Sequence, residues 1–344
     1  MVNITELLEF TKKSGASDLH LNAEARPMLR VNGAMKKLNL PVLSAKEMHV
    51  LTSDIMTEDQ QNRFEEKKEI DFSRELGNVG RFRVNAYYQN GGKAAVFRAI
   101  ENEIRSFEEL GLPEVVRSLS MRQKGMVLVT GPTGSGKSTT LAAMVDHINE
   151  TRPYHIITIE DPIEYIHESK NSLISQREVG RDTHSFANAL RSSLREDPDV
   201  ILVGELRDLE TIQLAITAAE TGHLVLGTLH TASVAKTVAR IVDVFPANQQ
   251  AQIQTMFADA VEGVIAQKLV AQKDGNGRVP ALEILVANTA IRSLIREKKT
   301  HQIPSTLQTH GSLGMQTMDQ ALKNLYTDNR IAKEVYEQYG DERV

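Results

Sequence analysis

The sequence predicts an α/β protein, and two observations support this fold class. Between residues 126 and 286, short apolar and β-branched runs alternate with segments of helical periodicity, which is typical of a parallel sheet covered by helices. Before this region, three alternating segments joined by glycine-rich turns predict an antiparallel meander. The chain has 344 residues, so we expect two domains with these different architectures.

Composition excludes several kinds of site. The chain has no cysteine, which rules out disulfides, thiolate metal sites and cysteine nucleophiles. The formal net charge is −5, and no block of like charges is long enough to form a charged tail. A dedicated nucleic-acid-binding protein usually carries a basic patch, so we expect no nucleic-acid partner. No apolar run approaches the ~18 residues of a membrane span, and we expect a cytoplasmic protein.

Residues 1–101 are expected to form an N-terminal domain of helices and strands. A strand over residues 28–31 ends at Asn32-Gly33, a pair that predicts a two-residue hairpin turn. Ser44 and Glu47 have the spacing of a capping box, in which side chains satisfy free backbone N–H groups at a helix start. Nothing in this domain is catalytic by itself.

The meander over residues 69–100 is the most informative part of this domain. Alternate side chains of a strand face opposite sides of a sheet, so Arg81 and Arg83 of its middle strand project from the same face. A solvated polar face is the commoner reason for such a pair, and spacing alone favours it. The alternative is a pair aimed at a phosphate group in a neighbouring subunit, with Arg98 of the next strand joining it.

A linker is expected over residues 102–124. Gly111-Leu112-Pro113 interrupts the chain there, and Pro113 suits the first turn of a short helix. We therefore expect a hinge between the N-terminal domain and a core over residues 125–290.

A glycine-rich motif follows the first apolar strand of this core, over residues 126–130, and precedes a helix. It matches G-x-x-x-x-G-K-[ST], in which backbone N–H groups and a helix N-terminus surround a phosphate group. The motif comprises Gly131, Pro132, Thr133, Gly134, Ser135, Gly136, Lys137, Ser138 and Thr139. Lys137 is expected to reach the β- and γ-phosphates and Ser138 to ligate Mg²⁺, so the sequence predicts binding of a nucleoside triphosphate.

A second apolar strand is expected at residues 156–159, and three carboxylates follow it directly. Ligands of open α/β sheets bind beyond the carboxyl ends of the strands, which favours a functional interpretation over a solvated acidic turn. We expect Glu164 to orient or deprotonate the attacking water and Asp161 to support it.

Two further strands also end in polar side chains. The apolar run 200–203 ends at Glu205, a carboxylate placed to help hold Mg²⁺ directly or through water. The next strand has a histidine at each end, and a lone histidine is more often a packed or solvated residue. His230 lies at the carboxyl end, where it would sense the γ-phosphate, whereas His223 at the other end would contact a neighbouring domain.

These four segments, in this order, resemble the secretion-ATPase superfamily of type II and type IV secretion and type IV pilus motors. The matching segments are GPTGSGKST, IEDPIEY, VILVGELRD and TGHLVLGTLHT. The resemblance extends to GRFRVN at 80–85 and to AIRSLIRE at 290–297. The second segment resembles the signature of the pilus-retraction branch, which has asparagine where this chain has Ser293. Pilus-extension and type II secretion members typically carry a four-cysteine zinc insert, which this chain cannot build.

The resemblance implies a hexameric ring with a PAS-like domain over residues 1–101, a RecA-like ATPase core over 125–290 and a helical region over 291–344. It matches Glu164 to a water-activating glutamate and Glu205 to the Walker B acid. It also implies that arginines of the N-terminal domain complete the ATP sites, and the candidates are Arg81, Arg83 and Arg98. It implies that the last signature transmits force through Arg292, Arg296 and Glu297.

The implied function is an ATP- and Mg²⁺-dependent motor for type IV pilus retraction and twitching motility. Its expected partners are further copies of itself, the inner-membrane platform protein of the pilus machine and an accessory retraction ATPase. We expect it at the cytoplasmic face of the inner membrane. The accessory retraction ATPase itself is the nearest alternative. A P-loop motor acting on nucleic acid and a nucleotide-gated scaffold without hydrolysis are less favoured.

Overall fold

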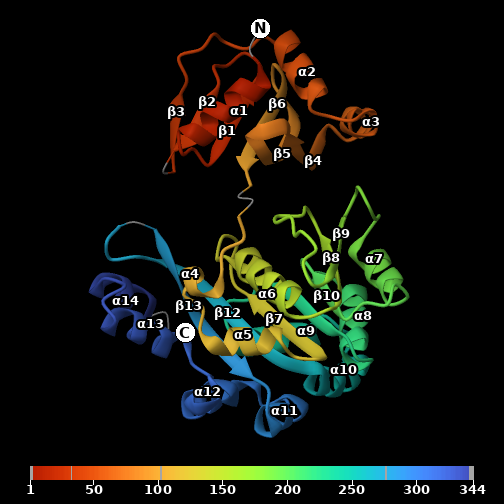
Figure 1. Ribbon diagram of the computed structural model, residues 1–344, viewed down its shortest axis with the longest axis vertical. Helices are drawn as coiled ribbons and strands as arrows, with labels where there is room; N and C mark the ends of the chain where they lie inside the picture. Colours follow the sequence, from red (N-terminus) through yellow and green to blue (C-terminus); the bar gives the residue numbers. More distant parts are fainter. Residues whose placement is uncertain (1–2, 32, 101–102, 276, 341–344) are drawn as a thin grey trace. The chain divides into compact units, whose positions relative to one another are not determined.

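The computed structural model describes residues 3–31, 33–100, 103–275 and 277–340. The chain divides into two compact units, Met1–Glu103 and Ile104–Val344, which Figure 1 traces from red to blue. Unit 1 combines helices with an antiparallel sheet, and unit 2 has a mostly parallel sheet. This confirms the predicted α/β class with a smaller α+β N-terminal domain. None of the helices in these ranges has the length and apolar character needed to cross a lipid bilayer.

Unit 1 is built on a six-stranded sheet in the order β3-β2-β1-β6-β5-β4, with every pairing antiparallel. Its strands are β1 (Asp18–Asn22), β2 (Met28–Val31), β3 (Ala34–Lys37), β4 (Glu69–Leu76), β5 (Gly80–Gln89) and β6 (Gly92–Ala99). Its helices are α1 (Ile4–Lys13), α2 (Ala45–Asp54) and α3 (Glu58–Lys67). The predicted meander is therefore confirmed as β4-β5-β6.

Local signals set the boundaries of these elements. The capping box is confirmed, because Ser44 and Glu47 exchange hydrogen bonds with each other's backbone at the start of α2. Val31 pairs with Ala34 across the β2–β3 hairpin, while Asn32 of the predicted turn lies outside the described residues. Along β5, period-two alternation buries Phe82 and the apolar residues that share its face.

Unit 2 contains a seven-stranded sheet in the order β13-β12-β7-β11-β10-β8-β9, in which only the β12–β13 pairing is antiparallel. Its strands are β7 (Gly125–Thr130), β8 (His155–Glu160), β9 (Leu173–Glu178), β10 (Val200–Val203), β11 (Leu224–Leu229), β12 (Val261–Ala271) and β13 (Arg278–Val286). The four strands predicted beside the motifs are β7, β8, β10 and β11. Strands β9 and β12 were not predicted, although β12 is an interior strand that lies next to β7.

The helices of unit 2 cover this sheet and extend beyond it (Figure 1). They are α4 (Phe107–Leu110), α5 (Glu114–Ser120), α6 (Lys137–Thr151), α7 (Phe186–Ser193), α8 (Leu209–Glu220), α9 (Val234–Asp243), α10 (Ala247–Ala260), α11 (Thr289–Arg296), α12 (Ile303–Thr309), α13 (Met318–Thr327) and α14 (Lys333–Gly340). Helices α4 and α5 occupy much of the range expected to be a linker, and they belong to unit 2.

The register of the parallel strands brings their carboxyl ends to one edge of the sheet. Thr130 at the end of β7 pairs with Leu229 at the end of β11. Val203 at the end of β10 pairs with Gly227 on one side and with Ile159 on the other. The segments that follow these four strands therefore start side by side, which is where an open α/β sheet binds its ligands.

Candidate active site

The phosphate loop runs from β7 into α6 and has a shape that glycine permits. Gly131 and Gly136 have φ of 144° and 87°, in the region that L side chains rarely adopt. A Cβ on Gly131 would also lie 2.2 Å from the backbone oxygen of Gln267, and one on Gly136 would lie 2.7 Å from its Nε2 atom. The loop is therefore pressed against β12 and needs glycine at both positions.

Lys137 begins α6 and is held by the loop itself. Its Nζ atom donates to the carbonyl oxygens of Gly131 and Pro132, at 2.8 and 3.0 Å. Burial lowers the pKa of Lys137, and the nearby charge of Glu205 offsets this only in part. No carboxylate of the described residues forms an ion pair with this ammonium group. The cation is thus positioned by neutral acceptors that a phosphate can replace.

Ser135 provides an unpaired polar group within the same loop. Its side chain is 3% exposed, and its hydroxyl has no hydrogen-bond partner among the described residues. Buried polar groups are nearly always hydrogen-bonded, so an unpaired one in a glycine loop is a mark of a ligand site. The loop fits a phosphate chain on this observation as well as on its sequence.

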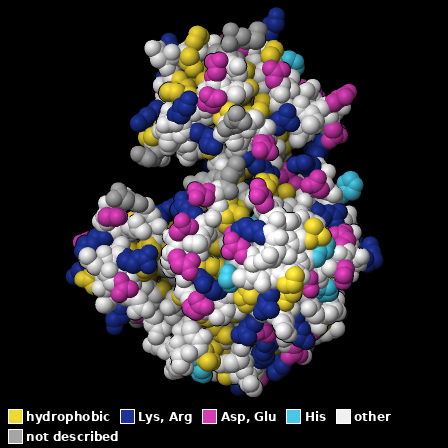
Figure 2. Space-filling view, viewed as in Figure 1, with side chains coloured by type: hydrophobic (Ala, Val, Ile, Leu, Met, Phe, Trp, Pro, Cys, Tyr) yellow, Lys and Arg dark blue, Asp and Glu magenta, His cyan; other side chains and the backbone are white. Residues whose placement is uncertain are grey.

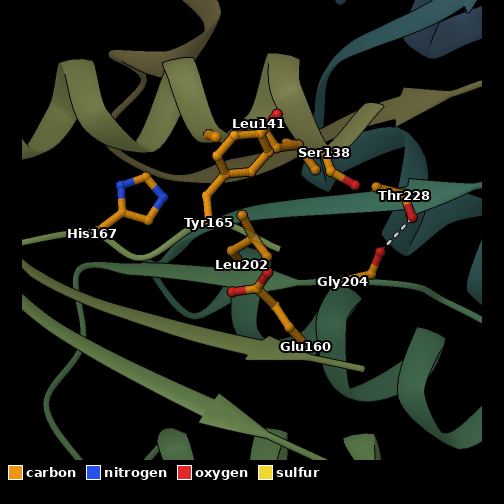
Figure 3. A pocket seen from close by; sticks show the side chains of 9 residues that line it. Ser138, Leu141, Glu160, Tyr165, His167, Leu202, Gly204 and Thr228 are labelled. Carbon is orange, nitrogen blue, oxygen red and sulfur yellow. Dashed lines mark hydrogen bonds between the residues drawn. The ribbon is translucent and has the colours of Figure 1, made fainter. Parts of the chain in front are cut away.

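Ser138, the predicted Mg²⁺ ligand, borders a small cavity of about 30 Å³, large enough for about one or two water molecules. Figure 3 shows this cavity with Glu160 on one side and the ring of Tyr165 on another. The hydroxyl of Tyr165 also hydrogen-bonds that of Thr139 at 2.9 Å, which links the loop to the segment after β8. His167 completes this side, and burial lowers its pKa to about 4.

Glu160 is the carboxylate that lines the cavity, and it was not singled out from the sequence. Burial raises its pKa, although the Thr158 hydroxyl donates to it at 2.7 Å and the backbone of Glu164 also hydrogen-bonds to it. Neither Glu164 nor Asp161 lines the cavity. Glu164 lies in the irregular segment that follows Glu160. Its side chain is partly exposed, and its charge contributes to raising the pKa of Glu160.

Glu205 follows β10 and is brought together with His230, as the sequence predicted for neighbouring strand ends. His230 Nε2 lies 3.2 Å from Glu205 Oε1, and Arg207 Nη2 lies 2.7 Å from Glu205 Oε2. Burial would raise the pKa of Glu205, but the hydrogen bonds and charges of Arg207 and His230 outweigh it and lower the pKa. The charge of Asp161 also raises the pKa of Arg207. The guanidinium of Arg207 therefore interacts electrostatically with the acidic segment after β8 as well as with Glu205 after β10.

Arg207 was missed although it stands in the quoted VILVGELRD segment, only two residues after Glu205. His223 lies at the opposite end of β11, where its Nδ1 atom is 2.9 Å from the carbonyl oxygen of Ala218 in α8. The structure therefore brings His230 to the phosphate edge and keeps His223 away from it.

The three arginines of unit 1 share a sheet face but differ in their surroundings. Arg81 is 6% exposed and donates to the Ser73 hydroxyl at 2.8 Å. Arg83 pairs in register with Arg98 on β6. Each of these two has a carboxylate neighbour in unit 1, Asp71 at 3.9 Å from Arg83 and Asp18 at 2.8 Å from Arg98.

The residues of the last signature contact α10 and the start of β12. Arg292 donates to the carbonyl oxygens of Ala258 and Asp259, at 2.6 and 2.7 Å, and to Glu262 at 2.7 Å. Arg296 forms an ion pair with Asp259. Val261 pairs with Met126, near the start of β7. The contact therefore lies near the amino end of β7, away from the carboxyl end that leads into the phosphate loop.

Ser293 and Glu297 form a contact of their own on α11. The Ser293 hydroxyl, which replaces the asparagine of the signature, donates to Glu297 at 2.8 Å. Lys299 lies 2.8 Å from the same carboxylate.

The described residues hold no cluster of three or more His, Asp or Glu side chains able to bind a metal ion on their own. Mg²⁺ in phosphate-transfer sites needs no such cluster, because it binds one or two protein oxygens and takes further ligands from phosphate and water. The Ser138 hydroxyl and the ionised Glu205 are oxygen donors of this kind. The residues present therefore fit Mg²⁺ together with a triphosphate.

Comparison with known proteins gives close relatives along nearly the whole chain. The family model described as type II/IV secretion system protein matches residues 2–339. The PilT type IV pilus retraction ATPase of Pseudomonas aeruginosa is 58% identical over 333 residues, covering 97% of this chain and 96% of PilT. A twitching motility protein of Neisseria gonorrhoeae is 58% identical over 308 residues, which cover 90% of this chain and 82% of that protein.

A more distant relative and a solved structure complete the comparison. PilU, a type IV pilus ATPase of Pseudomonas aeruginosa, is 40% identical over 96% of this chain and 86% of its own length. The crystal structure of the pilus retraction motor PilT with bound ADP superposes with a TM-score of 0.93 and 49% identity. It covers 100% of this chain and 98% of the PilT chain.

Proposed function

Because the chain belongs to the type II/IV secretion system protein family, we propose that it is an ATPase that drives type IV pilus retraction and twitching motility. The resemblance inferred from the four motifs is confirmed by the family match and by 58% identity to PilT over 97% of the chain. The observation that carries the proposal is the convergence of the phosphate loop, Glu205 and His230 on one edge of the sheet.

The loop binds the phosphates of ATP through its backbone N–H groups, and Lys137 leaves the loop carbonyls to reach the β- and γ-phosphates. Ser138 and, directly or through water, Glu205 are the residues that would hold Mg²⁺. The metal ion would neutralise negative charge on the phosphates. The lowered pKa of Glu205 supports this role, because only an ionised carboxylate is a ligand at neutral pH.

The carboxylates after β8 and the histidine after β11 have different roles in hydrolysis. Glu164 orients and deprotonates the attacking water, and Asp161 steadies this segment through the charge of Arg207. Glu160 has a raised pKa and bonds to the Glu164 backbone, which supports a role in holding that segment rather than in taking a proton. His230 reports loss of the γ-phosphate through its contact with Glu205.

The site is completed in a hexameric ring. Arg81, Arg83 and Arg98 from unit 1 of one subunit approach the phosphates bound by another, and release after hydrolysis opens that contact. Arg292, Arg296 and Glu297 transmit this movement toward the inner-membrane platform protein, at the cytoplasmic face of that membrane. An accessory ATPase of the PilU type is a second partner.

A PilU-type accessory role is the second candidate, since PilU matches 96% of this chain. Identity to PilT is 58% and identity to PilU is 40%, which favours the retraction ATPase itself. A motor acting on nucleic acid is disfavoured by the mixed charges that Figure 2 shows across the visible face of each unit.

Deletion of the gene tests the proposed function. Cells without a retraction motor should keep surface pili, often in excess, and lose twitching motility. The wild-type gene should restore twitching and the Glu164→Gln variant should not, although both proteins accumulate equally. Loss of surface pili in the deletion strain would indicate an extension motor and overturn the proposal.

A further inference from the structure

We propose that Gln267 on β12 is a positioning residue that holds the phosphate loop in the form that binds nucleotide. The proposal rests on the nucleotide binding of the proposed function and adds a residue outside the four motifs. Gln267 is 4% exposed and lies on β12, the interior strand between β13 and β7. Its neighbour Ala266 pairs with Thr130, the last residue before the loop, so Gln267 lies directly beside the start of the loop.

The amide of Gln267 bridges two parts of the nucleotide site. Its Nε2 atom donates to the backbone oxygen of Ser135 at 2.7 Å. Its Oε1 atom accepts from the hydroxyl of Thr140, in the first turn of α6, also at 2.7 Å. One side chain therefore joins the loop to the helix that follows it, from a strand more than a hundred residues later in the chain.

The bond to Ser135 controls the direction of a peptide group. In a planar trans peptide the C=O and N–H bonds point in opposite directions. By binding the Ser135 oxygen, Gln267 turns the N–H of Gly136 away from β12. This N–H is one of the loop donors that the motif uses for phosphate, so the side chain fixes its orientation before a ligand arrives.

The packing of the loop supports the same conclusion. The positions of Gly131 and Gly136 leave no room for a Cβ because atoms of Gln267 already occupy that space. Loss of the amide would leave the Ser135 oxygen and the Thr140 hydroxyl buried without partners, and the loop would turn to satisfy them elsewhere. The glycines allow that rearrangement, so the binding form depends on Gln267.

Binding of a fluorescent ADP analogue to the full chain, with thermal unfolding measured in parallel, tests the proposal. Gln267→Met keeps the length of the side chain and removes both hydrogen bonds, and we expect the Kd to rise about tenfold. Gln267→Glu keeps the acceptor for Thr140; when ionised it has no donor for Ser135 and adds a negative charge beside the phosphates, so at a pH that ionises it binding should weaken by at least a similar factor. Thr140→Val removes only the other bond and should change Kd by less than about threefold.

Gln254→Met is the matched control. Gln254 is also 4% exposed and also donates to a buried backbone oxygen, that of Ile295, but it touches no part of the loop. This variant should lower the Tm as much as Gln267→Met does and leave the Kd within about twofold of wild type. Equal weakening of binding by the two methionine variants would overturn the proposal, since the effect would then be general destabilisation.

Wild-type affinity in Gln267→Glu would also overturn it. If Gln267→Met does not fold, Gln267→Glu provides the comparison, because it retains the bond to Thr140. The ADP-binding assay does not depend on ATP turnover. A wild-type chain that binds ADP but releases no phosphate would therefore contradict the proposed function and leave this test valid.

Discussion

Both units of the molecule contain carboxylates whose pKa is shifted, but the causes of the largest shifts differ between the units. In unit 1, carboxylates are paired with cations: Asp18 bonds to Arg98, and the contact with Lys93 lowers the pKa of Glu65 to about 2. In unit 2, two carboxylates are buried away from cations: burial raises the pKa of Glu160, and it raises that of Glu283 to about 7. A cation thus holds Glu65 toward its ionised form, whereas burial pushes Glu160 and Glu283 toward their neutral form.

The same difference applies to the groups that would meet a phosphate. Lys137 is held by two neutral carbonyl oxygens, so it can move to a phosphate without breaking an ion pair. Arg98 must first leave Asp18, and Arg83 lies near Asp71. We therefore expect the affinity for nucleotide to come from unit 2. The arginines of unit 1 should contribute only when a phosphate group displaces the carboxylates that they contact.

Replacement of Lys137 should have the largest effect. Lys137→Ala removes the cation that the core holds ready, so we expect ATP turnover to fall at least about 1,000-fold and ADP affinity about 100-fold. The Tm should change little, because this side chain bonds only to its own loop. Lys170→Ala, which breaks surface ion pairs with Asp146 and Glu150, is the control and should hydrolyse ATP normally. Normal ADP binding by Lys137→Ala would contradict the comparison.

The two glutamates after β8 should differ strongly. Glu164→Gln removes the proposed base, and turnover should fall about 100- to 1,000-fold while ADP binding is retained. Glu160→Gln replaces a carboxyl that burial already pushes toward its neutral form, so turnover should fall less than about tenfold. Phosphate release under saturating ATP measures both. Equal losses would show that Glu160 acts as a charged group.

The double variant Arg83→Ala/Arg98→Ala separates binding from turnover. If these arginines act only on a phosphate in a neighbouring site, turnover should fall about 100-fold while the affinity of an isolated subunit for ADP stays within about twofold. Arg30→Ala, in the same sheet, removes a bond to the Gly33 oxygen and serves as the control. A large loss of ADP affinity in the double variant would contradict the assignment of affinity to the core.

The pH dependence of stability should reveal the buried carboxylate of unit 2. The pKa of Glu283 is raised from 4.5 to about 7, so the folded chain keeps a proton that the unfolded chain loses across this interval. Stability should therefore fall as pH rises from about 4.5 to about 7, by roughly 3 kcal/mol from this group. Glu283→Gln should remove that slope in Tm against pH. An unchanged slope would exclude the group as its source.

The pairs of unit 1 act at the other end of the pH scale. The folded pKa of Glu65 is lowered to about 2, so its contribution is present above about pH 4.5 and is lost as pH falls toward 2. Glu65 is half exposed, so the change should be smaller than that of Glu283. Glu65→Gln should flatten the acid limb of the unfolding curve of unit 1.

The sequence predicted the elements that carry strong local signals. The strands β7, β8, β10 and β11 are short apolar runs that end at polar motifs, and all four are present. Strand β9 was missed because its residues are mostly polar at the edge of the sheet. Strand β12 was missed because α10 passes into it directly, from Ala260 to Val261, without a glycine or proline to mark the change.

One side-chain contact of the candidate site agrees with the arrangement expected from the sequence, and two other features of the site were not foreseen. The motif residues Glu205 and His230 do meet, because parallel strands align their carboxyl ends. Gln267 could not be predicted, since its contact with Ser135 depends on how β12 lies beside β7 and spans 132 residues of sequence. Arg207 stood within a recognised motif, and its role became visible only through its contact with Glu205.

In the proposed ring, one subunit supplies the phosphate loop of each site and another supplies the arginines. Mixing two inactive proteins, Lys137→Ala and Arg83→Ala/Arg98→Ala, tests it most directly. The first has intact arginines and the second an intact core, so mixed rings would contain complete sites if the arginines act across subunits. We predict that the mixture hydrolyses ATP well above the sum of its components. Turnover equal to that sum, in rings shown to be mixed, would contradict the claim.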